Sequence, residues 1–163
     1  MHRSRSELKH APRGRCVFLA PHAALCEQRL KAWSHRFGAG LGKKVVRLTG
    51  ETAADLRLLE TGQIVIATLT QWDKLGRWGK QRKAVQKITL LIADDLHLTH
   101  RGGAGADVGV VVSRMRYIAA QTENGMRLLG LATSLANARD IGEWLGAKPH
   151  TTFNFSPAVR CVA

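Results

Sequence analysis

Five short hydrophobic runs alternate along the chain with segments whose apolar residues recur at helical spacing. Most of the runs are rich in Val, Ile or Leu at successive positions, which is typical of strands that are buried on both faces. Strands that alternate with helices form βαβ units. The pattern therefore predicts an α/β fold with a mostly parallel five-stranded sheet and helices on both faces, the strands lying at residues 16–20, 44–48, 64–67, 88–93 and 127–131.

The segments between the runs carry apolar stripes of helical period. In residues 22–37, Cys26, Leu30, Trp33 and Phe37 recur every three or four positions, and the glycines that follow end the predicted helix. Thr52, with Asp55 three residues later, resembles a capping box at the start of the next helix. Each helix would thus turn an apolar side toward the sheet.

Each of the five runs ends in small, polar or turn-forming residues. Right-handed crossovers place the carboxyl ends of parallel strands at one edge of the sheet, and open α/β sheets bind ligands at that edge. We therefore expect one edge to collect Pro21, Thr49 and Gly50, Thr68, Asp94 and Asp95, and Thr133 and Ser134.

Two adjacent carboxylates, Asp94 and Asp95, directly follow the fourth run. This is the pattern of a Walker-B site, in which one acid faces Mg²⁺ on a nucleotide and its neighbour orients water. A solvated turn after the strand is the alternative that the spacing leaves open. His97 and His100 lie three residues apart, but no third ligand accompanies them, which argues against a metal site of their own.

Composition places the chain among basic globular proteins. Its 163 residues suffice for one domain, and its formal net charge of +13 at pH 7 indicates a polyanionic partner, most simply nucleic acid. The alternative is a fragment whose acidic counterpart lies elsewhere. The charge is spread along the chain, so it indicates a class of partner and not a site.

Local composition predicts both the cellular compartment and the domain boundaries. No apolar run reaches about 18 residues, and residues 1–15 lack the apolar stretch of a secretory signal. We therefore expect a protein that is neither secreted nor membrane-spanning, with reduced cysteines. We expect a basic flexible tail at 1–14, one domain at 15–150 and an exit linker at 151–163.

Several motifs, in order along residues 14–160, are similar to the first RecA-like domain of the large superkiller-type DExH helicases, including those of pre-mRNA splicing. The motifs are Leu48-Thr49-Gly50-Glu51-Thr52, Trp72-Asp73, Lys80-Gln81-Arg82-Lys83, Asp94-Asp95-Leu96-His97, the segments 113–118 and 134–140, and Phe153-Asn154-Phe155. The resemblance implies an ATP- and Mg²⁺-dependent RNA helicase, with spliceosomal proteins as further partners and the nucleus as its location.

The resemblance also implies roles for individual residues. Asp94 matches the acid that coordinates Mg²⁺ with the nucleotide, Asp95 the position of the acid that activates water, and His97 the histidine that links nucleotide state to the rest of the motor. The remaining matched positions are Ala132, Thr133 and Ser134 for coupling hydrolysis to strand movement, and Ala20, Pro21, Ala24, Leu25, Thr49, Gly50, Glu51 and Thr68 for contact with the RNA backbone.

The chain also departs from the family pattern. The phosphate-binding motif G-x-x-x-x-G-K-[ST] is not found before Cys16, and the strand that carries it is interior in the family, so we expect a gap in the sheet. Asp95 is one methylene shorter than the usual glutamate, and Ala132 lacks a hydroxyl. In the family ATP binds between two RecA-like domains, and the second would follow residues 151–163. Because the phosphate-binding motif and this second domain are both missing from the sequence, we expect no ATPase activity from the chain alone. A non-catalytic RNA- or protein-binding module and a non-functional gene remnant remain as alternatives.

Overall fold

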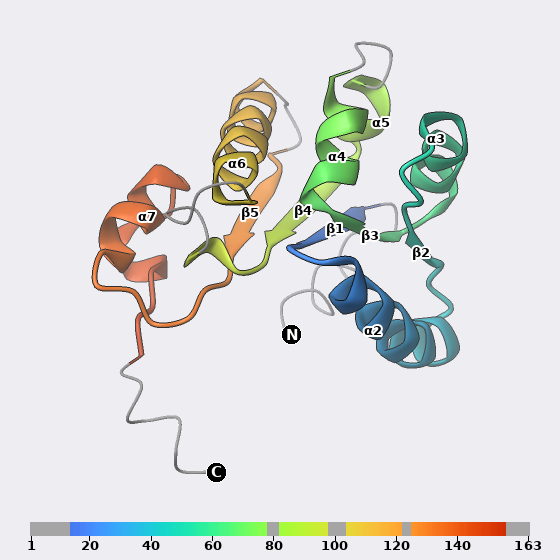
Figure 1. Cartoon of the computed structure of the whole chain (residues 1–163), viewed down its shortest axis with the longest axis horizontal. Helices are drawn as coiled ribbons and strands as arrows, with labels where there is room; N and C mark the ends of the chain where they lie inside the picture. Colours follow the sequence, from blue (N-terminus) through green and yellow to red (C-terminus); the bar gives the residue numbers. More distant parts are fainter. Residues whose placement is uncertain (1–13, 78–81, 98–103, 122–124, 156–163) are drawn as a thin grey trace.

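A single parallel sheet organises the protein in the computed structural model, which describes residues 14–77, 82–97, 104–121 and 125–155 (Figure 1). The strand order is β2-β3-β1-β4-β5, and every neighbouring pair is parallel. The strands are β1 Arg15–Ala20, β2 Val45–Arg47, β3 Ile64–Thr68, β4 Ile88–Ala93 and β5 Arg127–Gly130. The predicted fold class is confirmed.

Helices cover both faces of this sheet (Figure 1). On one face lie α2 Ala23–Trp33 and its continuation η1 Ser34–Ala39. The other elements are α3 Thr52–Thr61, α4 Leu69–Gly76, α5 Arg82–Gln86, α6 Ala104–Ala120, α7 Ala138–Trp144 and the short η4 Pro149–Thr151. Side chains of α3, α4 and α6 contribute to the apolar cluster on the opposite face. None of the described helices is both long and apolar enough to cross a bilayer.

Three aromatic rings fill the space between α2, η1 and the sheet. The Trp33 ring meets Phe18 of β1 at a centroid distance of 5.0 Å and Phe37 at 5.8 Å, both edge-to-face. All three side chains are buried, as is Cys26. The predicted apolar stripe is correct. However, the α-helix ends at Trp33 and continues as a π-helical turn, where Gly38 weakens the regular helix.

The sheet has no internal gap, contrary to our expectation. β1 lies between β3 and β4, and β4 pairs directly with β5, because the strands that are present close up against one another. Among the described strands, β5 pairs only with β4. Beside β5 is a hollow of about 890 Å³, whose lining includes Leu131, Phe153 and Phe155. These three side chains are exposed. Because β5 is the last strand in the order, the hollow lies at the end of the described sheet.

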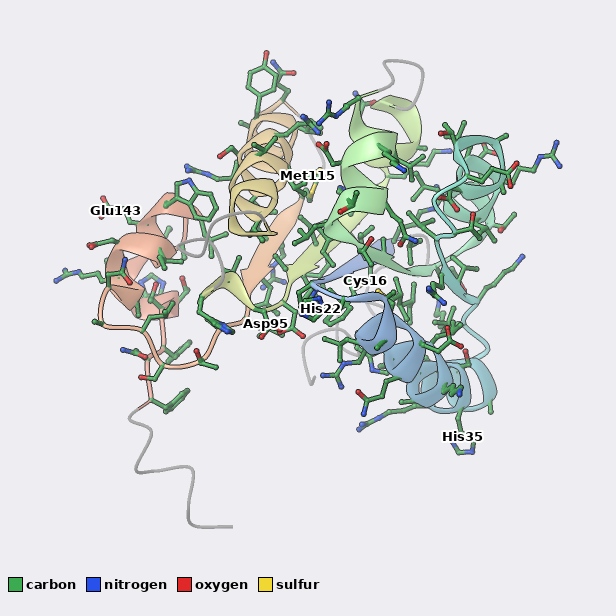
Figure 2. The ribbon with its side chains drawn as sticks, in the orientation of Figure 1. Cys16, His22, His35, Asp95, Met115 and Glu143 are labelled. Atoms are coloured by element: carbon green, nitrogen blue, oxygen red, sulfur yellow. The ribbon has the colours of Figure 1, made fainter. Side chains whose placement is uncertain are left out.

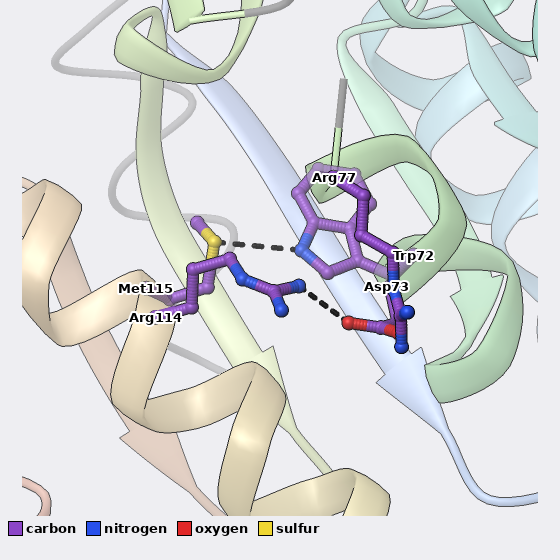
Figure 3. Close-up of polar contacts among 5 residues, drawn as sticks. All are labelled: Trp72, Asp73, Arg77, Arg114 and Met115. Carbon is purple, nitrogen blue, oxygen red and sulfur yellow. Dashed lines mark hydrogen bonds and ion pairs between the residues drawn. The ribbon is translucent and has the colours of Figure 1, made fainter. Parts of the chain in front are cut away.

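Two of the segments that resemble helicase motifs hold α4 and α6 together. Figure 3 shows the Trp72 indole N–H donating to the sulfur of Met115 at 3.5 Å and the Arg114 guanidinium bound to the Asp73 carboxylate. Arg77 Nε also donates to Asp73, at 2.8 Å. Trp72 and Met115 are buried, so these contacts lie at the centre of the interface between the two helices.

The Asp73→Asn variant is expected to lose about 2 kcal/mol of unfolding free energy at pH 7. Burial acts to raise the pKa of Asp73, but the hydrogen bonds and charges of Arg114 and Arg77 outweigh it and hold the pKa below its ordinary value. A lowered pKa stabilises the fold above the unfolded-state pKa, and this contribution is lost as pH falls through the folded pKa. Denaturant unfolding at pH 7 and pH 3 measures the effect.

The matched control is Asp140→Asn, which changes an exposed acid in the first turn of α7. We expect this variant to unfold within about 0.5 kcal/mol of the wild type at both pH values. A loss in Asp73→Asn that is equally large at pH 3 would contradict the ion-pair explanation.

Candidate functional site

The carboxyl ends of the strands lie at one edge of the sheet. Ala20 at the end of β1 is in register with Thr68 of β3, while Leu19 is in register with Ala93 of β4, and Ala93 with Gly130 of β5. The positions at this strand-end edge are Pro21, Thr49, Gly50, Thr68, Asp94, Asp95 and the loop 132–134. The geometry that we expected from right-handed crossovers is therefore present. Figure 2 shows Asp95 and His22 at this edge.

The first predicted RNA-contact segment begins at the end of β1. The Ala20 side chain is fully buried, so only its backbone could face a ligand. Pro21 and Leu25 are half-buried, whereas Ala24 is exposed in the first turn of α2. Of the four residues, Ala24 is therefore the one whose side chain is fully available to a partner at this edge.

The loop Thr49–Glu51 is shaped by a buried carboxylate. Asp55 Oδ1 accepts hydrogen bonds from Thr49 N at 2.6 Å and Thr49 Oγ1 at 2.9 Å, and Asp55 Oδ2 accepts from Gly50 N at 2.8 Å. Our expectation of a capping box between Thr52 and Asp55 is wrong, because Glu51 occupies the N-cap position and makes no side-chain cap bond. The positive φ of Gly50, 96°, turns the loop toward Asp55.

Thr68 has a structural role that our sequence analysis missed. Its hydroxyl accepts from Gln71 N at 3.3 Å, while its own N–H donates to Gln71 Oε1 at 3.0 Å. This is a complete capping box for α4, and the Thr-x-x-Gln spacing was the signal for it. The side chain is half-buried, so the Thr68 hydroxyl still has its own proton available for a ligand.

Asp94, Asp95 and His97 come together where β4 ends. Asp94 N donates to Leu19 O at 3.0 Å, which ties the acid to β1, and Asp94 Oδ1 accepts from Asp95 N at 3.0 Å. Asp95 has a φ of 55°, and one of its carboxylate oxygens lies 3.8 Å from His97 Nδ1. That separation is too long for a hydrogen bond, and the buried Nδ1 has no partner in the described structure. His97 thus has an unused ring nitrogen beside the acids.

Burial raises the pKa of the Asp94 carboxyl. The hydrogen bond from Asp95 N lowers it, the Asp95 charge raises it again, and the charges of Arg29 and His97 oppose the rise. The outcome is a half-buried carboxylate that lacks a direct cationic partner in the described structure. Such an acid gains from a cation placed against it, which is the property a Mg²⁺ ligand requires.

The Asp94→Asn variant is expected to raise the Tm at pH 7 by about 1–3 °C. A raised pKa means that the ionised carboxylate destabilises the fold at pH values above the folded-state pKa, and that this cost disappears below the unfolded-state pKa. The amide keeps an acceptor for Asp95 N and removes the charge. Thermal scans at pH 7 and pH 3 measure the difference.

The gain in Asp94→Asn should vanish at pH 3, since both forms are then neutral. Asp140→Asn is again the exposed control, with an unchanged Tm expected at both pH values. A lower Tm for Asp94→Asn at pH 7 would show that the carboxylate makes a stabilising contact that its surroundings do not indicate.

The loop after β5 is held by a residue that we had not singled out as a site residue. Asn154 Nδ2 donates to Leu135 O at 2.7 Å, and Asn154 Oδ1 accepts from Ser134 Oγ at 3.2 Å and Leu135 N at 3.4 Å. Ala132 and Thr133 are exposed and Ser134 is half-buried. One of the coupling residues that the resemblance implies, Ser134, is therefore joined to Asn154 near the end of the described chain.

The sequence matches the family described as DEAD/DEAH box helicase over residues 3–141. The chain belongs to the DEAD/DEAH box helicase family. Its relatives include the DExH-box ATP-dependent RNA helicase DExH12 of Arabidopsis thaliana, 53% identical over 148 residues, and the human U5 small nuclear ribonucleoprotein 200 kDa helicase, 48% identical over 155 residues. The resemblance to DExH-box RNA helicases is therefore confirmed.

Each match covers most of this chain but only a small part of the relative. It takes in 91% of this chain for the Arabidopsis helicase and 95% for the human helicase, but only 7% of either relative. Among solved structures, the DUF1998 helicase MrfA superposes with a TM-score of 0.70 over 88% of this chain and 23% of that one. At 21% identity this structure supports the fold alone.

The acidic site of this helicase-family chain fits a nucleotide-bound metal better than a metal held by protein alone. In the part of the chain that the structure describes, no three His, Cys, Asp or Glu side chains gather as a metal cluster. Mg²⁺ in nucleotide sites is bound through one or two carboxylates, with phosphates and water supplying the other ligands. A half-buried Asp94 with a raised pKa is compatible with that arrangement.

Proposed function

We propose that this chain is part of the ATP- and RNA-binding domain of a DExH-box RNA helicase of the pre-mRNA splicing type, working in the nucleus, and that it is inactive by itself. The observation that carries the proposal is the strand-end edge, where the two acids and the polar strand ends meet in one row. Family membership and relatives that are RNA helicases support it.

The chemistry at this edge divides among three groups of residues. Bound ATP would supply the energy of phosphoryl transfer, with Mg²⁺ held by Asp94. Asp95 would orient water, but its shorter side chain sets the carboxylate back by about 1 Å, and a displacement of that size costs on the order of 10²-fold in rate. Ala24, the loop Thr49–Glu51 and Thr68 would hold the RNA backbone. Spliceosomal proteins would be further partners.

RNA binding by the 163-residue chain tests the proposal. The variant Ala24→Asp places a negative charge where phosphate should lie, and an acid in the first turn of a helix does not destabilise it. We expect the wild type to bind labelled single-stranded RNA with an affinity that falls steeply with salt, and Ala24→Asp to bind about tenfold more weakly. The control, Ala120→Asp, changes an exposed alanine at the end of α6 and should bind as the wild type does.

ATP turnover tests the expected inactivity separately. The purified chain should show no RNA-stimulated hydrolysis, and measurable RNA-stimulated hydrolysis would contradict that part of the proposal. Absence of RNA binding near physiological salt would contradict the RNA-binding part.

A protein-docking module is the second candidate function. The exposed rings of Phe153 and Phe155 and the side chain of Leu131 border the hollow beside β5, and apolar residues grouped at a sheet edge suit contact with another polypeptide. Binding to splicing proteins that does not depend on salt, without RNA binding, would favour this function over the first.

A further inference from the structure

One helical layer of the molecule carries several cations and almost no acids. Residues 22–47, which form α2, η1 and β2, contain six Lys or Arg residues and a single acid, Glu27. The next segment, residues 48–76, contains two Lys or Arg residues and four acids. Residues 77–87 also contain five Lys or Arg residues and no acid, so the layer formed by residues 22–47 is one of several basic segments and the charge is spread along the chain as expected.

The acid in the basic layer is already paired. Glu27 binds the guanidinium of Arg47, and the other cations of the layer make no ion pair within the described structure. Lys31, Arg36 and Lys44 are exposed. These three side chains present positive charge that nothing in the described protein neutralises.

Arg29 links this layer to the strand-end edge. Its guanidinium lies 5.9 Å from the centre of the Phe18 ring, and its buried Nε has no hydrogen-bond partner in the described structure. Its charge also lowers the pKa of Asp94 against the effect of burial. The basic layer thus begins beside the acids of the strand-end edge and continues away from it along α2.

The end of the layer that is farther from the strand-end edge carries a surface depression. A depression of about 620 Å³ on α2 and the π-helical turn is lined by Ala32, Trp33, His35, Arg36, Ala39 and Gly40. Small residues leave it open, while His35 and Arg36 supply polar groups. Figure 2 shows His35 projecting away from the sheet at this end. π-helical turns are frequent at functional sites.

We propose that Lys31 of α2, Arg36 of η1 and Lys44, which directly precedes β2, form a second RNA-contact surface, the α2–η1 surface, that binds the phosphate backbone beyond the strand-end edge. The inference rests on the proposed function. α2 begins at Ala23, two residues after Pro21 at that edge. With η1 it extends about 25 Å, which is enough for several nucleotides. Flexible lysines and exposed arginines without acidic partners are the groups that bind phosphate in a sequence-independent manner.

A charge-matched pair of triple variants tests the surface. The first variant, Lys31→Gln/Arg36→Gln/Lys44→Gln, removes three cations from the α2–η1 surface. The second, Arg57→Gln/Lys74→Gln/Lys87→Gln, removes three exposed cations from α3, α4 and the turn before β4. The two variants have the same net charge, so a general electrostatic effect would change both equally. Thermal melting confirms that both are folded.

We expect the first variant to bind single-stranded RNA at least tenfold more weakly at low salt, and the slope of log affinity against log salt to decrease by about 2, at about 0.7 per lost contact. The second variant should keep the wild-type slope. Equal losses of RNA affinity in both variants, or no loss in the first, would contradict the proposed RNA-contact surface. If polyglutamate with the same total charge displaces the RNA, the surface binds polyanions in general and its assignment to RNA is contradicted.

Comparison with Ala24→Asp separates this inference from the proposed function. Weaker binding by Ala24→Asp, with none by the first triple variant, overturns the α2–η1 surface and leaves the proposed function standing. If only the first triple variant binds RNA more weakly, the result supports the α2–η1 surface and contradicts RNA contact at Ala24. A wild-type chain that binds no RNA overturns both.

Discussion

Replacing Trp33 with alanine is expected to lower the free energy of unfolding by about 3–5 kcal/mol, the largest loss that we anticipate from a single substitution. The ring is buried between Phe18 and Phe37 and meets both edge-to-face. Its removal leaves a cavity under the junction of α2 and η1 and also deletes two aromatic contacts. Equilibrium denaturation in urea measures the loss.

The controls for Trp33 separate packing from ring chemistry. Trp33→Phe keeps an aromatic ring and should cost less than half as much as alanine. Tyr117→Ala removes a ring that is 63% exposed and should change stability by no more than about 0.5 kcal/mol. A small loss in Trp33→Ala would mean that α2 is not held to the sheet by this aromatic cluster.

Replacing Asp55 with alanine should cost about 3 kcal/mol, because three donors of Thr49 and Gly50 would lose their acceptor. Asp55 is 1% exposed, so water cannot simply take its place. The loop that it orders also contains three of the predicted RNA-contact residues. We therefore expect RNA affinity to fall with stability. Urea denaturation and RNA titration at a temperature where the variant is folded measure the two effects.

Asp55→Asn is the matched variant for this loop. The amide oxygen can still accept from Thr49, whereas the amide nitrogen would face the Gly50 N–H, so an intermediate loss of about 1–2 kcal/mol is expected. Asp140→Ala, an exposed acid in the first turn of α7, should have little effect. Equal stability of Asp55→Ala and the wild type would contradict the hydrogen-bond pattern.

The strands and their common edge were predictable because local sequence carries their signal. A strand covered on both faces needs apolar side chains at successive positions, as in β3 and β4, whose residues are almost all buried. The crossover rule then places the strand ends together without further information. For the same reason the sequence alone assigns Asp94, Thr68 and Pro21 to one edge.

The contacts that shape the site were not predictable, because their partners are distant in sequence or lack a local pattern. Asn154 meets Ser134, and Asp73 meets Arg114, across long stretches of chain. Thr52 and Asp55 have the spacing of a capping box. That spacing is the same whether the Asp55 carboxylate turns to its own helix or to the preceding loop. The π-helical turn Ser34–Ala39 was not predictable either, because the spacing of the apolar residues fits a regular α-helix equally well.

The strand order has a consequence for how this polypeptide is made. β1 lies at the centre of the sheet, yet both of its neighbours, β3 and β4, come later in the chain. At about 5–20 residues per second, a ribosome needs several seconds between completing Ala20 and completing Ala93. During that interval an apolar strand, from Cys16 to Ala20, has no pairing partner on one or both sides. Nascent chains of this domain should therefore depend on chaperones until β4 has emerged.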